Sequence, residues 1–353
     1  MPVLGNLERD VMSIMFALSL IFFAGIINGS FALPTKHVVN WNFENIWLQY
    51  AIWAFVLLPW IVTFILVPNV LQVYAATPWQ YIIVMIIGGF LFGAGQIGFA
   101  FAMSMIGIGI SFVICIGLSI GLGFLLPLSI QHTNQLLTPF GFLTFFGAVL
   151  AIIGLSVATH AGQLHDKNTR KAMTVEEMPH PKYYWFGVTL AVIAGLFSAG
   201  QNFSFSLTSQ MQQIALHMGV SSLGASIIMW PGFLLFSFVP YAGYMLYLHH
   251  KHKSFGHYRK SQTSKYYLFA VIMGICWFGS LIFYSKASQL IGSLGPVVGW
   301  PMFMVLVILT SNFIGWRHKE WEDCTSQVKH TMYVGLSLLI CSVLVLGYTS
   351  QMY

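Results

Sequence analysis

The feature that most constrains this chain is a series of ten long apolar stretches with no charged side chain in their interiors. They cover residues 11–33, 46–67, 80–103, 106–128, 141–160, 184–206, 224–247, 266–285, 291–314 and 332–350. Each is close to the ~20 residues with which a helix crosses about 30 Å of hydrocarbon. Because lipid offers no partner for free backbone groups, these stretches are expected to be helical. The sequence therefore predicts an all-α membrane protein with ten transmembrane helices.

The composition supports a lipid environment. Of the 353 residues, 57% are hydrophobic and only 7% are Asp, Glu, Lys or Arg, whereas soluble chains carry about 25% charged residues. The net charge is +6, but the basic residues lie in a few short loops. This distribution indicates membrane topology and not nucleic-acid binding, so the expected partners are the lipid bilayer and a small solute.

The positions of lysine and arginine predict the orientation. If the N-terminus lies outside, the cytoplasmic segments hold 13 of these residues, against 2 in the opposite orientation. Lysine and arginine concentrate in short cytoplasmic loops, so both termini are expected on the periplasmic or extracellular side. On this topology the two longest loops, 161–183 and 248–265, are both cytoplasmic.

The span count also predicts an internal division. We expect a first five-helix repeat over 1–165, a cytoplasmic connecting loop over 166–183 and a second five-helix repeat over 184–353. An odd number of spans in each half gives the halves opposite orientations, which is the inverted repeat of many transporters. Phe92-Gly93 and Gly109 match Phe278-Gly279 and Gly295 at one fixed offset.

The polar residues inside the spans are the candidate binding residues. Charged groups at membrane depth usually mark ion sites or proton relays, so spans without them favour a neutral solute. Side-chain amides can both donate to and accept from the hydroxyl groups of such a solute. The candidates are Asn28, Gln96, Gln201 and Asn202, together with the aromatic residues Phe31, Phe99, Trp230, Trp277, Tyr284 and Trp300, which can stack on a sugar ring. The alternative is that the amides bond neighbouring helices and the rings pack or anchor the spans.

The sequence gives little indication of a cofactor, metal or catalytic site. The four cysteines are far apart and form no C-x-x-C pair, so neither a zinc site nor a redox motif is expected. A membrane-embedded enzyme or lipid-handling protein is a weaker alternative, because the one His/acid cluster of the chain, from His160 to Asp166, has no membrane-embedded catalytic set beside it. The stretch from His249 to Lys253 is expected to be a solvated loop.

Several motifs resemble the L-rhamnose–proton symporter family of the drug/metabolite transporter superfamily. The resemblance covers most of the chain, and its most specific part runs from Trp41 to Trp60. The matching pieces are the stretch from Pro34 to Trp47, Leu58-Pro-Trp60, Val67-Pro-Asn69, Phe92-Gly-Ala-Gly-Gln96, Met105-Ile-Gly-Ile-Gly109, Ala161-Gly-Gln-Leu164, Phe197-Ser-Ala-Gly200 and Lys319-Glu-Trp321.

The resemblance implies ten helices in two inverted halves, a central cavity and alternating access. It also implies uptake of a neutral, L-rhamnose-like sugar with protons across a bacterial inner membrane. Glu44, shared with the family pattern, is the acidic candidate for proton coupling, and His37 is a second titratable candidate. An interfacial anchor beside Trp41 and Trp47 is the alternative role for Glu44.

The start of the ninth span is also compatible with a second transport function. It begins Leu294-Gly-Pro-Val-Val-Gly-Trp300, without the carboxylate of the rhamnose proteins. An exporter or exchanger of amphipathic metabolites or drugs from the same superfamily is therefore the main alternative to sugar uptake. The substrate, the direction of transport, the coupling ion and the oligomeric state stay open at this stage.

Overall fold

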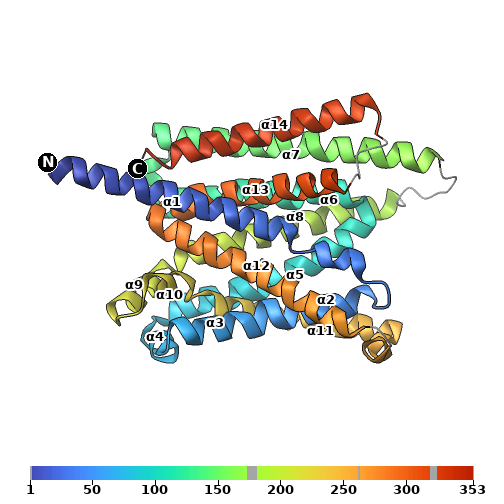
Figure 1. Cartoon of the computed structure of the whole chain (residues 1–353), viewed down its shortest axis with the longest axis horizontal. Helices are drawn as coiled ribbons and strands as arrows, with labels where there is room; N and C mark the ends of the chain where they lie inside the picture. The colour runs from blue at the N-terminus through green and yellow to red at the C-terminus, as the bar shows by residue number, and fades with distance from the viewer. Residues whose placement is uncertain (1, 173–180, 261–262, 319–323, 353) are drawn as a thin grey trace.

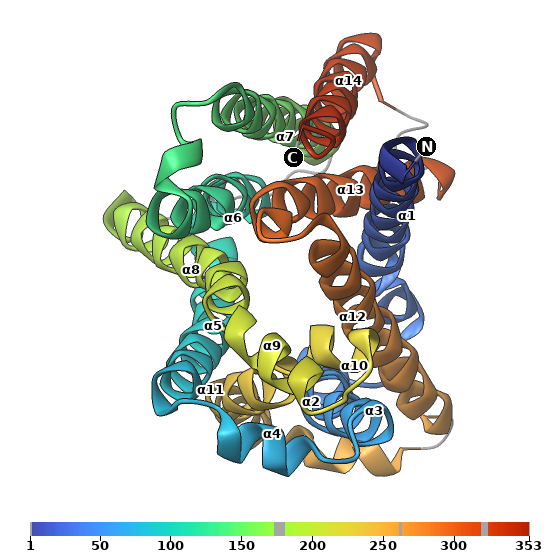
Figure 2. The same cartoon turned by 90° about the vertical axis from the view of Figure 1, so that its left-hand side faces the viewer.

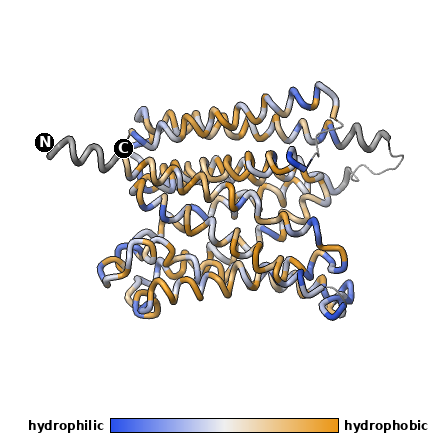
Figure 3. Tube along the Cα trace, in the orientation of Figure 1, coloured by the Kyte–Doolittle hydropathy of each residue, from blue (hydrophilic) through white to orange (hydrophobic). Residues whose placement is uncertain are grey.

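The computed structural model describes residues 2–172, 181–260, 263–318 and 324–352. Within these residues, ten helical segments are long and apolar enough to cross a membrane, which confirms the predicted fold class. Hydrophobic residues dominate the middle of the helices and hydrophilic residues gather at their ends (Figure 3). The hydropathy pattern is thus arranged as a bilayer requires.

The ten spans are built from long helices, several of which have short companions. In chain order the elements are α1 (Pro2–Ser30), η1 (Leu33–His37), α2 (Phe43–Ala51), a π-helical segment η2 (Ile52–Leu57), α3 (Leu58–Leu66), α4 (Val70–Ala76), α5 (Trp79–Ile106), α6 (Ile108–Gln131), η3 (Thr133–Gln135), α7 (Pro139–Ala172), α8 (Pro181–Leu207), α9 (Ser209–His217), α10 (Ser222–Ile227), α11 (Trp230–His252), η4 (Ser254–Arg259), α12 (Ser264–Ile291), α13 (Gly295–Arg317) and α14 (Ser326–Thr349).

The bundle has two distinct ends (Figure 1). One carries α4, α9 and α10, and here α1 begins and α14 ends; we call it the α9–α10 end. The other carries η1 and η4, and we call it the η4 end. The second span is interrupted between them by the π-helical segment η2, which packs on α11 and α12. π-Helical segments are rare in proteins, and those that occur are often found at functional sites.

The helix packing follows a reciprocal pattern. Helix α1 of the first half packs against α12 and α13, while α8 of the second half packs against α5 and α6. Helix α6 meets α13, and α7 lies beside α14 at the edge of the bundle (Figure 2). In the α1–α13 contact, a Cβ atom on Gly25 would collide with Leu306 and one on Gly29 with Thr310, so this close crossing needs both glycines.

Three predicted boundaries are wrong because apolar runs mark the lipid-facing length of a helix and not its full length. Helix α12 extends beyond residue 285, where the eighth apolar stretch ends, so Lys286 lies inside a helix. Helix α11 extends to His252, and η4 occupies much of the predicted loop 248–265. The connecting loop is shorter than 166–183, since α7 ends at Ala172 and α8 begins at Pro181. Lys319-Glu-Trp321 lies outside the described residues.

Candidate functional site

Asn202 of α8 joins four helices at a buried junction. Its side chain is fully buried, and its Nδ2 atom donates to the carbonyl oxygens of Gly123 at 2.8 Å and Pro296 at 2.9 Å. The hydroxyl of Tyr284 donates to its Oδ1 atom. Pro127 has no N–H, so the Gly123 carbonyl, four residues earlier in α6, lacks its usual helical donor. The Asn202 amide takes that place and links α8 to α6, α12 and α13.

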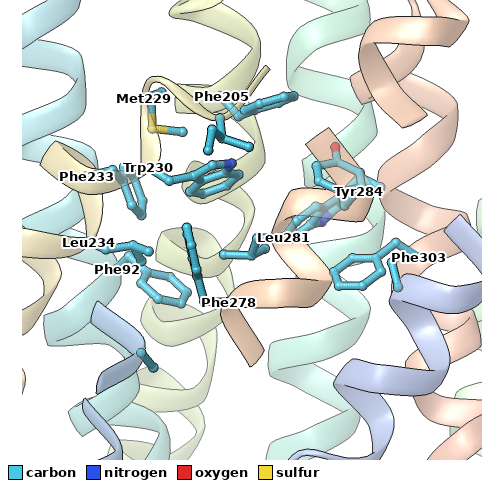
Figure 4. Packing of buried hydrophobic residues seen from close by; sticks show 14 of the residues in the cluster. Phe92, Phe205, Met229, Trp230, Phe233, Leu234, Phe278, Leu281, Tyr284 and Phe303 are labelled. Carbon is cyan, nitrogen blue, oxygen red and sulfur yellow. The ribbon is translucent and has the colours of Figure 1, made fainter. Parts of the chain in front are cut away.

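Large aromatic side chains surround the junction. Trp230 is fully buried, stacks on Phe205 with ring centroids 5.4 Å apart, and donates through Nε1 to Ser285 at 2.6 Å. Tyr284 and Trp300 are also fully buried and meet edge to face at 5.5 Å. Figure 4 shows Phe205, Trp230 and Tyr284 among the packed residues of this region. The predicted residues Asn202, Trp230, Tyr284 and Trp300 are therefore brought together, but as a packed core.

A pocket opens beside this core at the α9–α10 end. Its volume is about 390 Å³, within the ~300–1,000 Å³ range of small-molecule sites. Apart from Phe205, Gly292 and Pro296, its lining is polar: Gln131, His132, Ser206, Ser209, Gln212, Gln213, Ser288, Gln289 and Ser293. None of the described residues that line it is an acid, a lysine or an arginine. The pocket therefore offers amide and hydroxyl groups around one aromatic ring.

Hydrogen bonds across the pocket connect its helices. Ser206 of α8 donates to the Gln131 side chain of α6 at 2.5 Å. A ring nitrogen of His132 lies 3.1 Å from the carbonyl oxygen of Ser293. Lys286 of α12 donates to the side-chain oxygen of Gln289 at 3.0 Å and so orients a pocket residue.

Aromatic rings of α2, η2 and α12 pack together in the η4 half of the bundle, and a second pocket of about 350 Å³ lies in the same half between α6, α7, α13 and α14. Phe31 lies 5.5 Å from Tyr50, Tyr50 lies 5.9 Å from Phe55, and Phe55 lies 5.1 Å from Trp277, measured between ring centroids. Trp47 packs edge to face on Tyr50 at 5.3 Å. We call these five residues the aromatic plug. Two of them, Phe31 and Trp277, were predicted from the sequence to contact substrate.

The two proton-coupling candidates have different environments. Glu44 is 2% exposed at the start of α2, where its carboxylate lies 3.1 Å from the Nδ1 atom of His252. His37 is exposed on η1 beside the ring of Phe269, at 6.4 Å. The histidine that meets Glu44 therefore belongs to the stretch 249–253. The prediction that this stretch is a solvated loop is wrong, because it is the last turn of α11 and His249 is fully buried.

The remaining candidates lie around the core. Asn28 of α1 donates to the hydroxyl of Ser280 on α12 at 2.8 Å, which is a contact between helices. Gln201 is buried, and its Nε2 atom has no hydrogen-bond partner among the described residues. Gln96 and Phe99 are partly buried on α5, where Phe99 meets Phe112 of α6 at 5.1 Å.

Sequence reasoning missed most of the pocket. Gln131, Gln212, Ser288 and Gln289 were not predicted, because they lie where the spans end and resemble ordinary interfacial residues. A signal was present in the polar run Ser209-Gln-Met-Gln-Gln213, directly after the sixth span, and in Gln131-His132, directly after the fourth. Polar residues gathered at several span ends on one side would have indicated a shared pocket.

Comparison with known proteins identifies the family. Residues 11–351 match the model of the family described as L-rhamnose-proton symport protein (RhaT). An L-rhamnose-proton symporter of Mannheimia succiniciproducens is 26% identical over 330 residues, which cover 90% of this chain and 92% of the relative. One from Yersinia pestis (strain Pestoides F) is 25% identical over 324 residues, with the same coverage. This multi-pass membrane protein therefore belongs to the L-rhamnose-proton symport protein family, a family of transporters and not of enzymes.

Proposed function

We propose that this protein is a secondary transporter that carries a neutral sugar of the L-rhamnose type, together with protons, across the bacterial inner membrane by alternating access. The relatives named as L-rhamnose-proton symporters support the sugar and the proton. The observation that carries the proposal is the pocket of about 390 Å³ lined by amides and hydroxyls around Phe205. A sugar presents hydroxyl groups and apolar ring faces, and this lining matches both.

The reciprocal helix packing supports two inverted halves. Exchanging the halves turns the contacts of α1 with α12 and α13 into those of α8 with α5 and α6. With the predicted orientation, the α9–α10 end faces outward and the η4 end faces the cytoplasm. The pocket then opens outward while the aromatic plug closes the opposite side. This arrangement corresponds to one state of an alternating-access cycle.

The Asn202 junction is the proposed deeper part of the substrate path. Phe205 lines the pocket and also stacks on Trp230, and Pro296 lines the pocket while its carbonyl binds Asn202. Separation of α8 from α13 would release the Asn202 amide and expose Trp300 to the pocket. The Nε2 atom of Gln201, which has no hydrogen-bond partner among the described residues, lies one residue away on α8 and is a further donor for a sugar hydroxyl.

A sugar uptake assay tests this function. The protein would be reconstituted in liposomes, and uptake of labelled L-rhamnose and other neutral sugars measured with and without an inward proton gradient. We expect saturable uptake of at least one sugar, accelerated by the gradient. Uptake at the same rate with and without the gradient would support sugar transport but contradict proton coupling. Absence of uptake for every sugar under every gradient would contradict the proposal.

Two glutamines of α9 provide a matched pair for the pocket itself. Gln212 lines the pocket, whereas Gln210 on the same helix is exposed and does not. Gln212→Ala is expected to raise KM about fivefold, because one hydrogen bond to substrate contributes about 1 kcal/mol. Gln210→Ala is expected to leave KM unchanged. Equal KM values for the two variants would place the sugar elsewhere.

A further inference from the structure

Glu44 occupies an unusual position among the acidic residues. Eight of the nine lie in the segments 8–10, 166–177 and 320–323, and Glu44 is the ninth. It lies in the first turn of α2 at the η4 end with its side chain 2% exposed. Burying a carboxylate is costly unless it is paired and hydrogen-bonded. The partners of Glu44 therefore determine how this end of the bundle is held together.

Three side chains donate to the Glu44 carboxylate. The Nδ1 atom of His252 lies 3.1 Å from Oε1, and the Nδ2 atom of Asn42 donates to the same oxygen at 3.2 Å. The hydroxyl of Ser254 is a further hydrogen-bond partner. These donors satisfy the ionised form of the carboxylate. Two of them, His252 and Ser254, come from the second half of the chain, so Glu44 ties α2 to α11 and to η4.

A second histidine is connected to Glu44 through Ser254. The Nδ1 atom of the fully buried His249 lies 2.8 Å from the Ser254 hydroxyl, and its Nε2 atom lies 3.1 Å from the hydroxyl of Tyr258. Tyr258 donates in turn to the carbonyl oxygen of Asn45 at 3.1 Å. Burial raises the pKa of Tyr258 to about 12, so this hydroxyl keeps its proton at neutral pH.

Other titratable and charged groups surround this cluster on the neighbouring elements. They are Lys36 and His37 on η1, His250, Lys251 and Lys253 at the end of α11, His257, Arg259 and Lys260 around η4, and Lys265, Tyr266 and Tyr267 on α12. The lysines, Arg259, His37 and His250 are exposed. Their charges are screened by water, whereas His252, itself 42% exposed, lies 3.1 Å from the Glu44 carboxylate.

The bond between His252 and Glu44 depends on protonation. Histidine is the side chain whose charge ordinarily changes between about pH 5 and 8. A protonated imidazole donates a charge-assisted hydrogen bond to a carboxylate, which is roughly twice as strong as a neutral one. Proton binding to the His252 imidazole, with the three donors holding the carboxylate ionised, therefore strengthens the contact between α2 and α11.

We propose that Glu44, His252, Ser254 and His249 form a proton-binding latch that keeps the η4 end closed, and that protons arriving at this end tighten it. The sidedness of this inference rests on the proposed function, which places the η4 end in the cytoplasm. Opening this end separates α2 from α11 and breaks the latch. An acidified cytoplasm therefore slows inward opening, and an alkaline cytoplasm permits it. Sugar release would then be faster when the cytoplasm is alkaline and slower when it is acidified.

Access to the closed end can be measured without sugar. A cysteine introduced at Leu48, which is 7% exposed on α2, would report opening through its reaction with a membrane-impermeant maleimide. The four native cysteines would be replaced by alanine, and rates normalised to Lys260→Cys, an exposed position that corrects for the pH dependence of thiol chemistry. We expect normalised labelling to be about fivefold faster at pH 8 than at pH 6, from the difference between charged and neutral hydrogen bonds.

Variants of the latch residues distinguish a proton-sensitive contact from a purely structural one. His252→Gln is expected to reduce the pH effect to less than about 1.5-fold, since glutamine donates at every pH. Glu44→Gln is expected to speed labelling at both pH values. His250→Gln, the same change at an exposed neighbour, is expected to retain the full effect. Ile46→Cys, also buried on α2, provides a second reporter if Leu48→Cys is not monodisperse.

Two outcomes would overturn the latch. They are equal normalised labelling of the parent at pH 6 and pH 8, and a full pH effect in His252→Gln. Sugar uptake by the same preparations separates the latch from the proposed function. Uptake without pH-dependent labelling would refute the latch alone, whereas pH-dependent labelling without uptake of any sugar would refute the proposed function alone.

Discussion

The two ends of this bundle are built from the same helices but differ in their interiors. At the α9–α10 end, the helix termini separate around a pocket of about 390 Å³ lined mainly by amides and hydroxyls. In the η4 half, the aromatic plug packs α2 and η2 against α12, Glu44 ties α2 to α11, and the pocket of about 350 Å³ lies to one side, between α6, α7, α13 and α14. A polar lining can exchange its hydrogen bonds with water or a solute, whereas packed rings exclude both. This difference is the basis of the proposed alternating-access state, in which one end is accessible and the other closed.

The largest expected effect concerns Asn202, which lies between the two ends. Asn202→Leu removes the donor of two buried carbonyls and the acceptor of the Tyr284 hydroxyl. Leaving such groups unpaired costs about 1–3 kcal/mol each, so the free energy of unfolding is expected to fall by about 3 kcal/mol or more. Asn28→Leu, which breaks one bond to Ser280, is the control and should cost about 1 kcal/mol. Denaturant titration in detergent, followed by tryptophan fluorescence, measures both.

A pair of glycines on α6 gives the next largest effect. A Cβ atom on Gly123 would lie 2.6 Å from Nε1 of Trp300, whose ring is fixed by a bond from that atom to the carbonyl of Ser119. Gly123→Ala is therefore expected to destabilise the protein by about 2 kcal/mol through overpacking. Gly121→Ala meets only an ordinary contact at 3.5 Å and should be neutral or stabilising by up to about 1 kcal/mol. Equal thermal stability of the two variants would contradict this close packing of α6 on α13.

The smallest expected effect concerns the rim of the pocket. Lys286→Gln weakens the contacts that orient Gln289 and Ser222, and it is expected to raise KM for the sugar about threefold with kcat retained. Lys260→Gln removes an exposed lysine at the η4 end and should leave KM unchanged. A change in kcat alone for Lys286→Gln would indicate a role in the conformational step and not in the pocket.

The sequence predicts the ten-helix architecture well, but it predicts the pocket lining and the contacts between α2 and the end of α11 poorly. Ten uncharged apolar stretches dictate ten helices, because lipid permits few alternatives. Asn202 was recognised because a buried amide inside a span needs a partner or a ligand. Gln212 and Gln289 could not be recognised individually, since a polar residue at a span end is equally compatible with the lipid interface. His249 and His252 were assigned to a loop, because their neighbours are basic and local composition does not reveal that α2 packs against them.

One labelling experiment tests most directly whether the two ends differ in access. Ser209→Cys lies in the pocket lining and Leu48→Cys lies in the closed half, and both would be exposed to an impermeant maleimide from both sides of the membrane. Without sugar, we expect Ser209→Cys to react and Leu48→Cys to be protected. Addition of a transported sugar should slow the first reaction and speed the second. Rapid labelling of Leu48→Cys together with Ser209→Cys in the absence of sugar would contradict one-sided access.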